Sequence, residues 1–426
     1  MLNKSPHIYL ISDSTGETVS IVARSVYARF ENINFNGKSI LVSSNYIEDN
    51  DSLLIGVTII DAGNEGSVVT FNSGENNNAI LQGFTLQNGN GNDEDPDNNG
   101  SFYTYGGGIY CENSDPLIKD CIIQSNTANE GGGAVIFCYD SSPIFFGCTI
   151  KENETDDVGG GLYARDGSSP SFFDCIFMDN TAEFGGGCYL KSSSSPLMEN
   201  VVFIQNNANN SGGGIGLKDD ANIEASNLTI SENLAEGLGG GLYINNADPT
   251  FSFALIADNT ASSGAGIYIR NNSEIDLTNI TLANNNAGLY GGGVYMRDNV
   301  TVNFTNSVLW NNGSNQIYFR SEGAEVELNV GYSIVENNQN GVETNDNGDL
   351  NWLEGNVDSE PYFCSSSTGN YFVRENSPCI DGGLNGSLIG CLSAGCGPIN
   401  LGPVWYVDSN GDNTSDGSLE TPFETI

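Results

Sequence analysis

The stretch that decides the fold is GGGLYARDGSSPSFFDCIFMDN, residues 159–180, because a second version of it, TAEFGGGCYLKSSSSPLMENVVFIQN, follows at once in residues 181–206. A glycine triplet, GAG in one copy, begins at Gly106, Gly131, Gly159, Gly185, Gly212, Gly239, Gly264 and Gly291. A second phrase of the kind CIFMDN ends at Asn126, Asn153, Asn180, Asn206, Asn233, Asn259, Asn285 and Asn312. Successive asparagines are 26 or 27 residues apart. A fixed period of this length predicts a stacked repeat protein.

Within each repeat the apolar residues alternate with a period of two, which is typical of strands. In residues 159–180 the alternation places Leu162 and Ala164 on one face of a first strand, and Phe172 and Phe177 in a later apolar run. Short strands joined by Gly, Asn and Ser-Pro turns cannot bury such a face alone. Stacking the repeats at about 4.8 Å gives every strand a parallel partner and closes a core. The sequence therefore predicts an all-β parallel β-helix, and crossover handedness favours a right-handed coil.

Three kinds of residue recur in fixed places, and each has a predicted structural role. The glycines are expected at tight corners, where φ must be positive or a Cβ would clash. The repeated asparagines are expected in left-handed turns, with stacked amides bonded along the axis. One register holds Cys121, Cys148 and Cys175, then Val201, Leu228, Ala254 and Ile280. We interpret this register as a stack of small buried hydrophobic side chains, and a row of reactive thiols is the alternative.

The pattern divides the chain into four parts. The predicted boundaries are 1–33 for a strand-turn-helix segment, 34–345 for the β-helix with its most regular coils in 105–312, 346–403 for a Cys- and Gly-rich end segment, and 404–426 for the truncated start of a further β-helix-like domain. The helix of the first part is expected from a stripe formed by Val19, Val22, Ala23, Val26 and Phe30. In the end segment, Cys364, Cys379, Cys391 and Cys396 could form two disulfides.

The composition excludes several classes of function. Thirteen Lys and Arg face 54 Asp and Glu, and the formal net charge of −41 repels phosphate backbones and anionic lipid. We therefore expect no nucleic-acid partner, and no apolar run is long enough to predict direct membrane insertion. His7 is the single histidine, which removes most Ser-His-Asp, Cys-His and His-metal chemistry. No two CxxC pairs occur, so a zinc site is not predicted.

The repeats resemble a known family. GGG[IL]Y followed by FMDN (177–180) or FIQN (203–206) resembles the GGAI…FxxN repeats of polymorphic outer membrane proteins and, more broadly, bacterial right-handed parallel β-helix repeat proteins. The resemblance covers roughly residues 34–345. It implies a protein that is secreted or displayed on the cell surface as part of a larger polypeptide. It does not select a function, because this architecture serves adhesins, polysaccharide lyases and glycoside hydrolases alike.

The N-terminus has a resemblance of its own. HIYLISDSTGETVSIVARSVYARF, residues 7–30, resembles the start of the bacterial phosphoenolpyruvate synthase and pyruvate, phosphate dikinase regulatory proteins, which are cytosolic kinase/phosphorylases. Their phosphate-binding loop is missing, since Gly37, Lys38 and Ser39 lack the preceding loop glycine. A nucleotide-dependent regulatory enzyme is thus a minor alternative. Our hypothesis is a fusion, natural or from gene assembly, that replaced the export signal of the β-helix protein.

The residues that alternate with the buried positions of the first strand are expected to face outward. They form one row of Tyr110, Tyr163, Tyr189, Tyr243, Tyr268 and Tyr295, broken by Gly216, and a second row of Arg165, Lys191, Lys218, Asn245, Arg270 and Arg297. Tyrosine rings stack on sugar faces, and evenly spaced cations can pair with uronate carboxylates along a polymer. The rows therefore predict a glycan-binding face. The alternative is a purely structural face on which Asp166, Asp219 and Asp298 neutralise the cations that precede them.

Two acidic loops are candidate calcium sites, and calcium is the only cofactor considered. The alternating oxygen ligands are Asp93, Asp95 and Asp97 in the first loop, and Asp408, Asn410, Asp412 and Asp416 in the second. Neither loop has the sixth-position glycine or the later bidentate glutamate of an EF-hand. Plain solvated loops are the alternative.

The sequence favours an extracellular or cell-surface module for adhesion, glycan binding or structure, with a polysaccharide or a surface protein as its partner. The rival interpretation is a polysaccharide lyase or glycoside hydrolase of the same fold. No catalytic residue is predicted, because neither a pair of carboxylates nor aligned acidic calcium ligands are evident on the predicted face.

Overall fold

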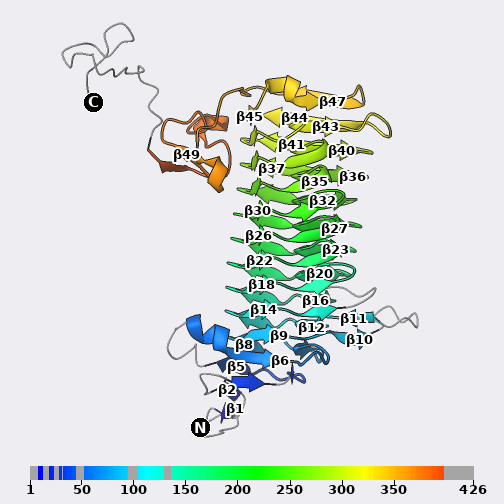
Figure 1. The fold of residues 1–426 in the computed structure, drawn as a ribbon, viewed down its shortest axis with the longest axis vertical. Helices are drawn as coiled ribbons and strands as arrows, with labels where there is room; N and C mark the ends of the chain where they lie inside the picture. Colours follow the sequence, from blue (N-terminus) through cyan, green and yellow to red (C-terminus); the bar gives the residue numbers. More distant parts are fainter. Residues whose placement is uncertain are drawn as a thin grey trace, which may run out of the picture.

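The computed structural model describes residues 8–12, 19–23, 28–30, 32–44, 52–94, 103–128 and 136–397 of the chain. These residues form an elongated stack of coils with the strands running across the long axis (Figure 1). Each regular coil gives one strand to each of three long sheets, named A, B and C here, and most coils add a strand to a fourth, short sheet. The predicted all-β parallel solenoid is therefore confirmed.

The strands are given sheet by sheet in their spatial order. Sheet A consists of β1 (Ile8–Ser12), β2 (Val19–Ala23), β5 (Leu41–Ser44), β8 (Ile80–Gln82), β13 (Leu117–Lys119), β17 (Ile144–Phe146), β21 (Ser171–Phe173), β25 (Leu197–Glu199), β29 (Glu224–Ser226), β33 (Thr250–Ser252), β37 (Ser273–Thr278), β41 (Val300–Thr305), β44 (Val326–Gly331) and β47 (Gly348–Trp352). Sheet B consists of β3 (Ala28–Phe30), β6 (Thr58–Asp61), β9 (Thr85–Gln87), β14 (Ile122–Gln124), β18 (Thr149–Lys151), β22 (Ile176–Met178), β26 (Val202–Ile204), β30 (Thr229–Ser231), β34 (Leu255–Ala257), β38 (Thr281–Ala283), β42 (Val308–Trp310) and β45 (Ile334–Val335).

Sheet C and the short sheet form the side of the stack that matters for the site below. Sheet C consists of β4 (Ile33–Asn34), β7 (Val69–Phe71), β12 (Ile109–Glu112), β16 (Ile136–Tyr139), β20 (Leu162–Arg165), β24 (Cys188–Lys191), β28 (Ile215–Lys218), β32 (Leu242–Asn245), β36 (Ile267–Arg270), β40 (Val294–Arg297), β43 (Ile317–Phe319) and β46 (Val342–Glu343). The short sheet consists of β15 (Thr127–Ala128), β19 (Glu154–Thr155), β23 (Thr181–Phe184), β27 (Asn207–Ser211), β31 (Leu234–Ala235), β35 (Thr260–Ser263) and β39 (Asn286–Tyr290).

The remaining elements lie outside these four sheets. They are the antiparallel pair β10 (Asn92–Glu94) and β11 (Tyr103–Tyr105), the three strands β48 (Phe363–Ser365), β49 (Asn370–Arg374) and β50 (Ala394–Cys396), and the 3-10 turns η1 (Ser52–Val57), η2 (Asn338–Gly341), η3 (Ser366–Thr368) and η4 (Leu384–Gly386). Within the described ranges no helix is long and apolar enough to cross a membrane.

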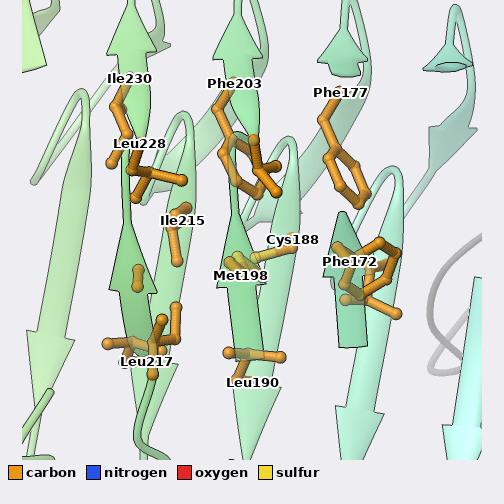
Figure 2. Packing of buried hydrophobic residues seen from close by; sticks show 14 of the residues in the cluster. Phe172, Phe177, Cys188, Leu190, Met198, Phe203, Ile215, Leu217, Leu228 and Ile230 are labelled. Carbon is orange, nitrogen blue, oxygen red and sulfur yellow. The ribbon is translucent and has the colours of Figure 1, made fainter. Parts of the chain in front are cut away.

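The core runs the length of the solenoid, because equivalent residues of successive coils pair in register. Phe177 of β22 is aligned with Phe203 of β26, and their rings stack at 4.7 Å between centroids (Figure 2). Cys121, Cys148 and Cys175 are all buried. Burial raises the pKa of the Cys121 thiol to about 12, so this side chain is a protonated thiol at neutral pH. All three side chains pack in the hydrophobic core, as predicted, although a hydrogen bond with Cys148 lowers the pKa of the Cys175 thiol.

The repeated asparagines form a buried amide ladder along the axis. The side-chain oxygen of Asn206 accepts from the backbone and side-chain N–H groups of Asn180, and its own side-chain NH₂ donates to the oxygen of Asn233. The same bonds link successive members from Asn126 to Asn312. The stacked amides are confirmed.

The predicted left-handed conformation of these asparagines is wrong by one residue. The positive φ belongs to the residue just before each of them, for example Asp179 before Asn180 and Gln205 before Asn206. The turn at this preceding residue directs the next side chain into the interior. There the amide of the next asparagine and a backbone carbonyl, Ile150 for Asn180 and Phe177 for Asn206, supply the partners that a buried asparagine requires.

The helix predicted for the N-terminal segment is also wrong in the part that is described. Residues Val19–Ala23 form β2 and Ala28–Phe30 form β3, whereas Val26 lies outside the described residues. β2 pairs in parallel with β5 of the first coil, and β3 pairs with β6. The first coil presents unpaired backbone groups at its edge, and a β-branched run such as VSIVA satisfies them better as a strand than as a helix.

Within the predicted end segment of 346–403, β47 continues sheet A, and residues 358–397 dock on the outer face of sheet B, beside the coils in Figure 1. The Tyr371 hydroxyl donates to Asp258 and accepts from Asn284, and the Asn279 side chain donates to the Leu388 carbonyl. One of the two disulfides that four cysteines allow is formed, between Cys364 and Cys396, while Cys379 and Cys391 are free thiols. The segment therefore covers apolar residues on the outer face of sheet B that the coils alone would leave exposed.

Candidate functional site

A groove of about 630 Å³ runs along the outer face of sheet C. Its floor is formed by β20, β24, β28, β32 and β36, and its rims are formed by β11, by Asp157 and Val158 before the Gly159 triplet, and by Phe184 at the end of β23. The lining residues are Tyr103, Tyr105, Asp157, Val158, Tyr163, Arg165, Phe184, Tyr189, Lys191, Lys218, Tyr243, Asn245 and Arg270. An open groove of this kind suits an extended polymer better than a small enclosed ligand.

Seven of the ten glycan-binding residues that the sequence predicts line this groove. They are Tyr163, Arg165, Tyr189, Lys191, Lys218, Tyr243 and Arg270. The other three, Tyr268, Tyr295 and Arg297, continue the same rows on β36 and β40, past the end of the groove. The two sequence rows therefore lie on a single surface that the structure hollows along part of its length.

The tyrosine rings are buried, which corrects the expectation of an open stacking platform. Tyr163, Tyr189 and Tyr243 are only 6%, 7% and 7% exposed. Neighbouring rings cover one another, because coils about 4.8 Å apart bring side chains of the same register into contact. The Tyr268 and Tyr295 centroids, for example, are 4.8 Å apart. Most ring faces are therefore taken up by the next ring of the stack.

The stack is interrupted once, at Gly216. This glycine lies in register between Tyr189 and Tyr243 and separates a lower cluster of rings from an upper one. The lower cluster contains Tyr105, Tyr110, Phe137, Tyr163 and Tyr189, and the upper cluster contains Tyr243, Tyr268 and Tyr295. A Cβ on Gly216 would lie 2.7 Å from the Cδ2 atom of Tyr189, so this ring leans over the glycine.

The cations of the second row fall into two groups. Three are paired with the aspartate that follows them, as the structural alternative predicts: Arg165 with Asp166, Lys218 with Asp219 at 3.9 Å, and Arg297 with Asp298. Lys191 and Arg270 are followed by serine and asparagine instead, and neither forms a salt bridge among the described residues, although the charge of Lys191 acts on the Asp157 carboxyl at the rim.

Arg270 is the most distinctive cation of the groove. Its Nε atom is buried and has no hydrogen-bond partner, one of three such side-chain atoms in the described part of the chain. The guanidinium carbon lies 5.8 Å from the ring centroid of Tyr243, within the range of a cation–π contact. A buried N–H without an acceptor is costly, and the part of the Arg270 side chain that lines the groove can bind an anionic oxygen.

Two carboxylates of the rim were missed at the sequence level. Asp157 lines the groove, and the Phe184 N–H donates to its carbonyl, which places Glu183 beside it on the next coil. Burial raises the pKa of the Asp157 carboxyl above its usual range, the neighbouring Glu183 raises it further, and Lys191 acts in the opposite direction. A signal was present, since both residues stand two positions before a glycine triplet.

The comparisons with known proteins agree with this geometry. The family described as right handed beta helix region matches residues 97–227 and 213–377, together more than half of the 426 residues. The chain belongs to the right-handed β-helix family. No curated protein and no solved structure matches it. The predicted handedness of this right-handed β-helix is thereby confirmed, while the fold by itself does not choose between adhesin and enzyme.

The candidate calcium ligands of this right-handed β-helix fall almost entirely outside the described residues. Asp93 is exposed on β10, whereas Asp95, Asp97, Asp408, Asn410, Asp412 and Asp416 belong to ranges that the structure does not describe. Where side chains are described, no group of three His, Cys, Asp or Glu residues is placed to hold a metal ion. The calcium sites stay predictions.

Proposed function

We propose that this right-handed β-helix is a non-catalytic adhesion module of an extracellular or cell-surface protein, and that it binds an acidic polysaccharide in the sheet C groove. The observation that carries the proposal is the pair of cations that form no salt bridge among the described residues, Lys191 and Arg270, in a groove on a protein of formal charge −41. Cations kept unpaired on so acidic a chain are best explained by an anionic ligand.

The resemblances support the location and the origin of the module. The repeats are similar to those of polymorphic outer membrane proteins, and the Cys364–Cys396 disulfide is typical of an oxidising compartment outside the cytosol. We propose that residues 1–33 come from a fusion with a relative of the dikinase regulatory proteins. A purely protein partner for the groove is the alternative occupant.

The proposal is tested by titrating the full chain with polygalacturonate, alginate, heparin and neutral dextran in a calorimeter. We expect an acidic polymer to bind and dextran not to bind. Lys191→Ala and Arg270→Ala should each weaken binding about 10-fold, because each removes a charge-assisted bond worth about 1.5 kcal/mol. Arg320→Ala is the control, since Arg320 lies outside the groove and has Asp298 at 3.7 Å. Absence of binding to every glycan would refute the proposal, as would equal binding by all three variants.

Binding should also strengthen as the pH falls. The pKa of Asp157 is raised by burial, so this carboxyl becomes neutral at a higher pH than an exposed aspartate does. A neutral Asp157 no longer attracts Lys191, and we expect binding to tighten about 3-fold as the pH is lowered from 7 through the range in which uronates stay ionised. Asp157→Asn should bind at pH 7 as the natural chain binds at low pH, with a flat profile. Weaker binding at the lower pH would contradict this assignment.

A glycoside hydrolase is the second candidate, and Asp157 is the observation that favours it. A carboxyl with a raised pKa next to a second carboxylate, Glu183, is the arrangement that a general acid requires. Release of reducing ends or unsaturated sugars from any of the four polymers, lost in Asp157→Asn, would replace the adhesion proposal. A nucleotide-dependent enzyme rests on residues 7–30 alone, and absence of ADP and ATP binding would dismiss it.

A further inference from the structure

We propose that the gap in the tyrosine stack at Gly216 is a slot for one anionic sugar ring, held between Tyr189 and Tyr243. This inference rests on the proposed function and deepens it, because it names the subsite that fixes the position of the polymer in the groove. Gly216 is the only member of the row from Tyr163 to Tyr295 that has no side chain.

The spacing of the strands gives the slot the width of a single ring. Tyr189 and Tyr243 lie on β24 and β32, two strand intervals apart, which is about 9.6 Å of backbone separation. Contacting ring atoms prefer a separation of about 3.5–4.0 Å, so two tyrosine rings this far apart leave room for one ring between them. Where tyrosines occupy adjacent strands no such room exists, as the 4.8 Å between the Tyr268 and Tyr295 centroids shows.

The orientation of the Tyr189 ring indicates that no side chain packs against its face on the Gly216 side. In the upper cluster the rings are close to parallel, at 14° between Tyr243 and Tyr268 and 7° between Tyr268 and Tyr295. Tyr189 is instead tilted by 47° from Tyr163 and leans toward Gly216, since no side chain supports it from that side. An inserted sugar ring would supply this support, and to admit it the Tyr189 ring, whose Cδ2 atom lies 2.7 Å from the Cβ position of Gly216, has to turn away.

The charges around the slot select an anionic ring. Lys218 follows Gly216 by two residues on the same strand, and Lys191 occupies the same register on the strand before it. The Lys218–Asp219 pair is long, at 3.9 Å, and both side chains are more than a third exposed, so a ligand can replace Asp219 at little cost. Beyond Tyr243, on the next strand, the Arg270 guanidinium carbon lies 5.8 Å from the centroid of the Tyr243 ring. A carboxylate or a sulfate on the inserted ring meets Lys191 and Lys218, and Arg270 extends the positive charge to the neighbouring ring of the polymer.

The test is to fill the slot with the residue that the neighbouring coils carry. Gly216→Tyr completes the stack once the Tyr189 ring turns away from the new Cβ, and we expect the circular dichroism spectrum of the natural chain to be kept. Binding of hexagalacturonate, with one carboxylate per ring, or of a heparin hexasaccharide, with sulfates, should weaken at least 30-fold, and which of the two is affected identifies the anion. Gly288→Tyr, on the exposed strand β39 where the site of a Cβ is open, is the matched control and should bind normally.

The outcomes separate this inference from the proposed function. If an acidic hexasaccharide binds both the natural chain and Gly216→Tyr equally while Lys191→Ala weakens it, the slot is refuted and the adhesion proposal stands. If no acidic glycan binds the natural chain, both fail together. Neutral maltohexaose binding as tightly as hexagalacturonate overturns the anionic assignment.

A second measurement does not depend on the variant folding. Saturation-transfer NMR on the natural chain, with irradiation of the tyrosine ring protons, should label one sugar ring of the hexasaccharide more strongly than the others. Uniform labelling of all six rings would refute the slot.

Discussion

Replacing Asn233 by alanine should lower the free energy of unfolding by about 4 kcal/mol, because four buried polar groups lose a partner at about 1 kcal/mol each or more. The Asn233 side chain accepts from the backbone and side-chain N–H groups of Asn206, and it donates to the Phe203 carbonyl and to the Asn259 side chain. Water cannot replace these bonds, since Asn233 is 1% exposed. Urea unfolding followed by circular dichroism measures the loss.

Asn209→Ala is the control for this variant. Asn209 lies on β27 one coil earlier and is exposed, so its replacement should change the stability by less than about 0.5 kcal/mol. A loss of 1 kcal/mol or less for Asn233→Ala would show that the ladder can be broken without leaving its neighbours unsatisfied, and would contradict its structural role.

The second large effect is expected at the middle glycine of a triplet. In Gly213→Ala the new Cβ would lie 2.4 Å from the Gly240 carbonyl oxygen and 2.4 Å from the Leu234 carbonyl oxygen. Both obstacles are backbone atoms of the next coil, so they cannot move without opening the stack. We expect a loss of about 3 kcal/mol or more, measured by the same urea titration.

Gly288→Ala is the control that shows whether a loss of stability comes from the close Cβ contact or from replacing any glycine. Its nearest obstacle is the Ala261 carbonyl oxygen at 4.0 Å, an ordinary contact distance, so the substitution should be close to neutral. Equal losses in Gly213→Ala and Gly288→Ala would mean that the close packing of the triplets does not limit the stability of the solenoid.

Much of the fold follows from the sequence because each coil repeats the same physical problem. The period set by Asn180, Asn206 and Asn233 predicts the stacking, and the amide ladder then follows from burial. The left-handed turn was displaced by one residue, since Gln205 and Asn206 carry equally suitable side chains and only the coil geometry decides which one enters the core. The helix predicted from Val19 onward failed because a local stripe does not reveal that an open sheet edge lies nearby.

The site could be predicted only in part. The tyrosine row of Tyr163 and the cation row of Lys191 and Arg270 were both predictable, because each is fixed by the same register in every coil. The burial of the tyrosine rings could not be predicted from the sequence, since it depends on the size of a ring relative to the distance between coils. The rim residue Asp157 was missed because the turn before each triplet varies in sequence, and its position opposite the tyrosines comes from tertiary packing.

The docked end segment has a mechanical consequence. Its bonds reach Asp258, Asn279, Asn284 and Asn306, which lie on three successive coils, so a pull applied at residue 397 is shared among those coils. The force then acts as shear across several contacts at once, whereas a chain leaving directly from β47 would peel its last strand one hydrogen bond at a time. Under flow or traction the contacts of the docked segment would therefore have to break together, which requires a higher force than breaking them one after another.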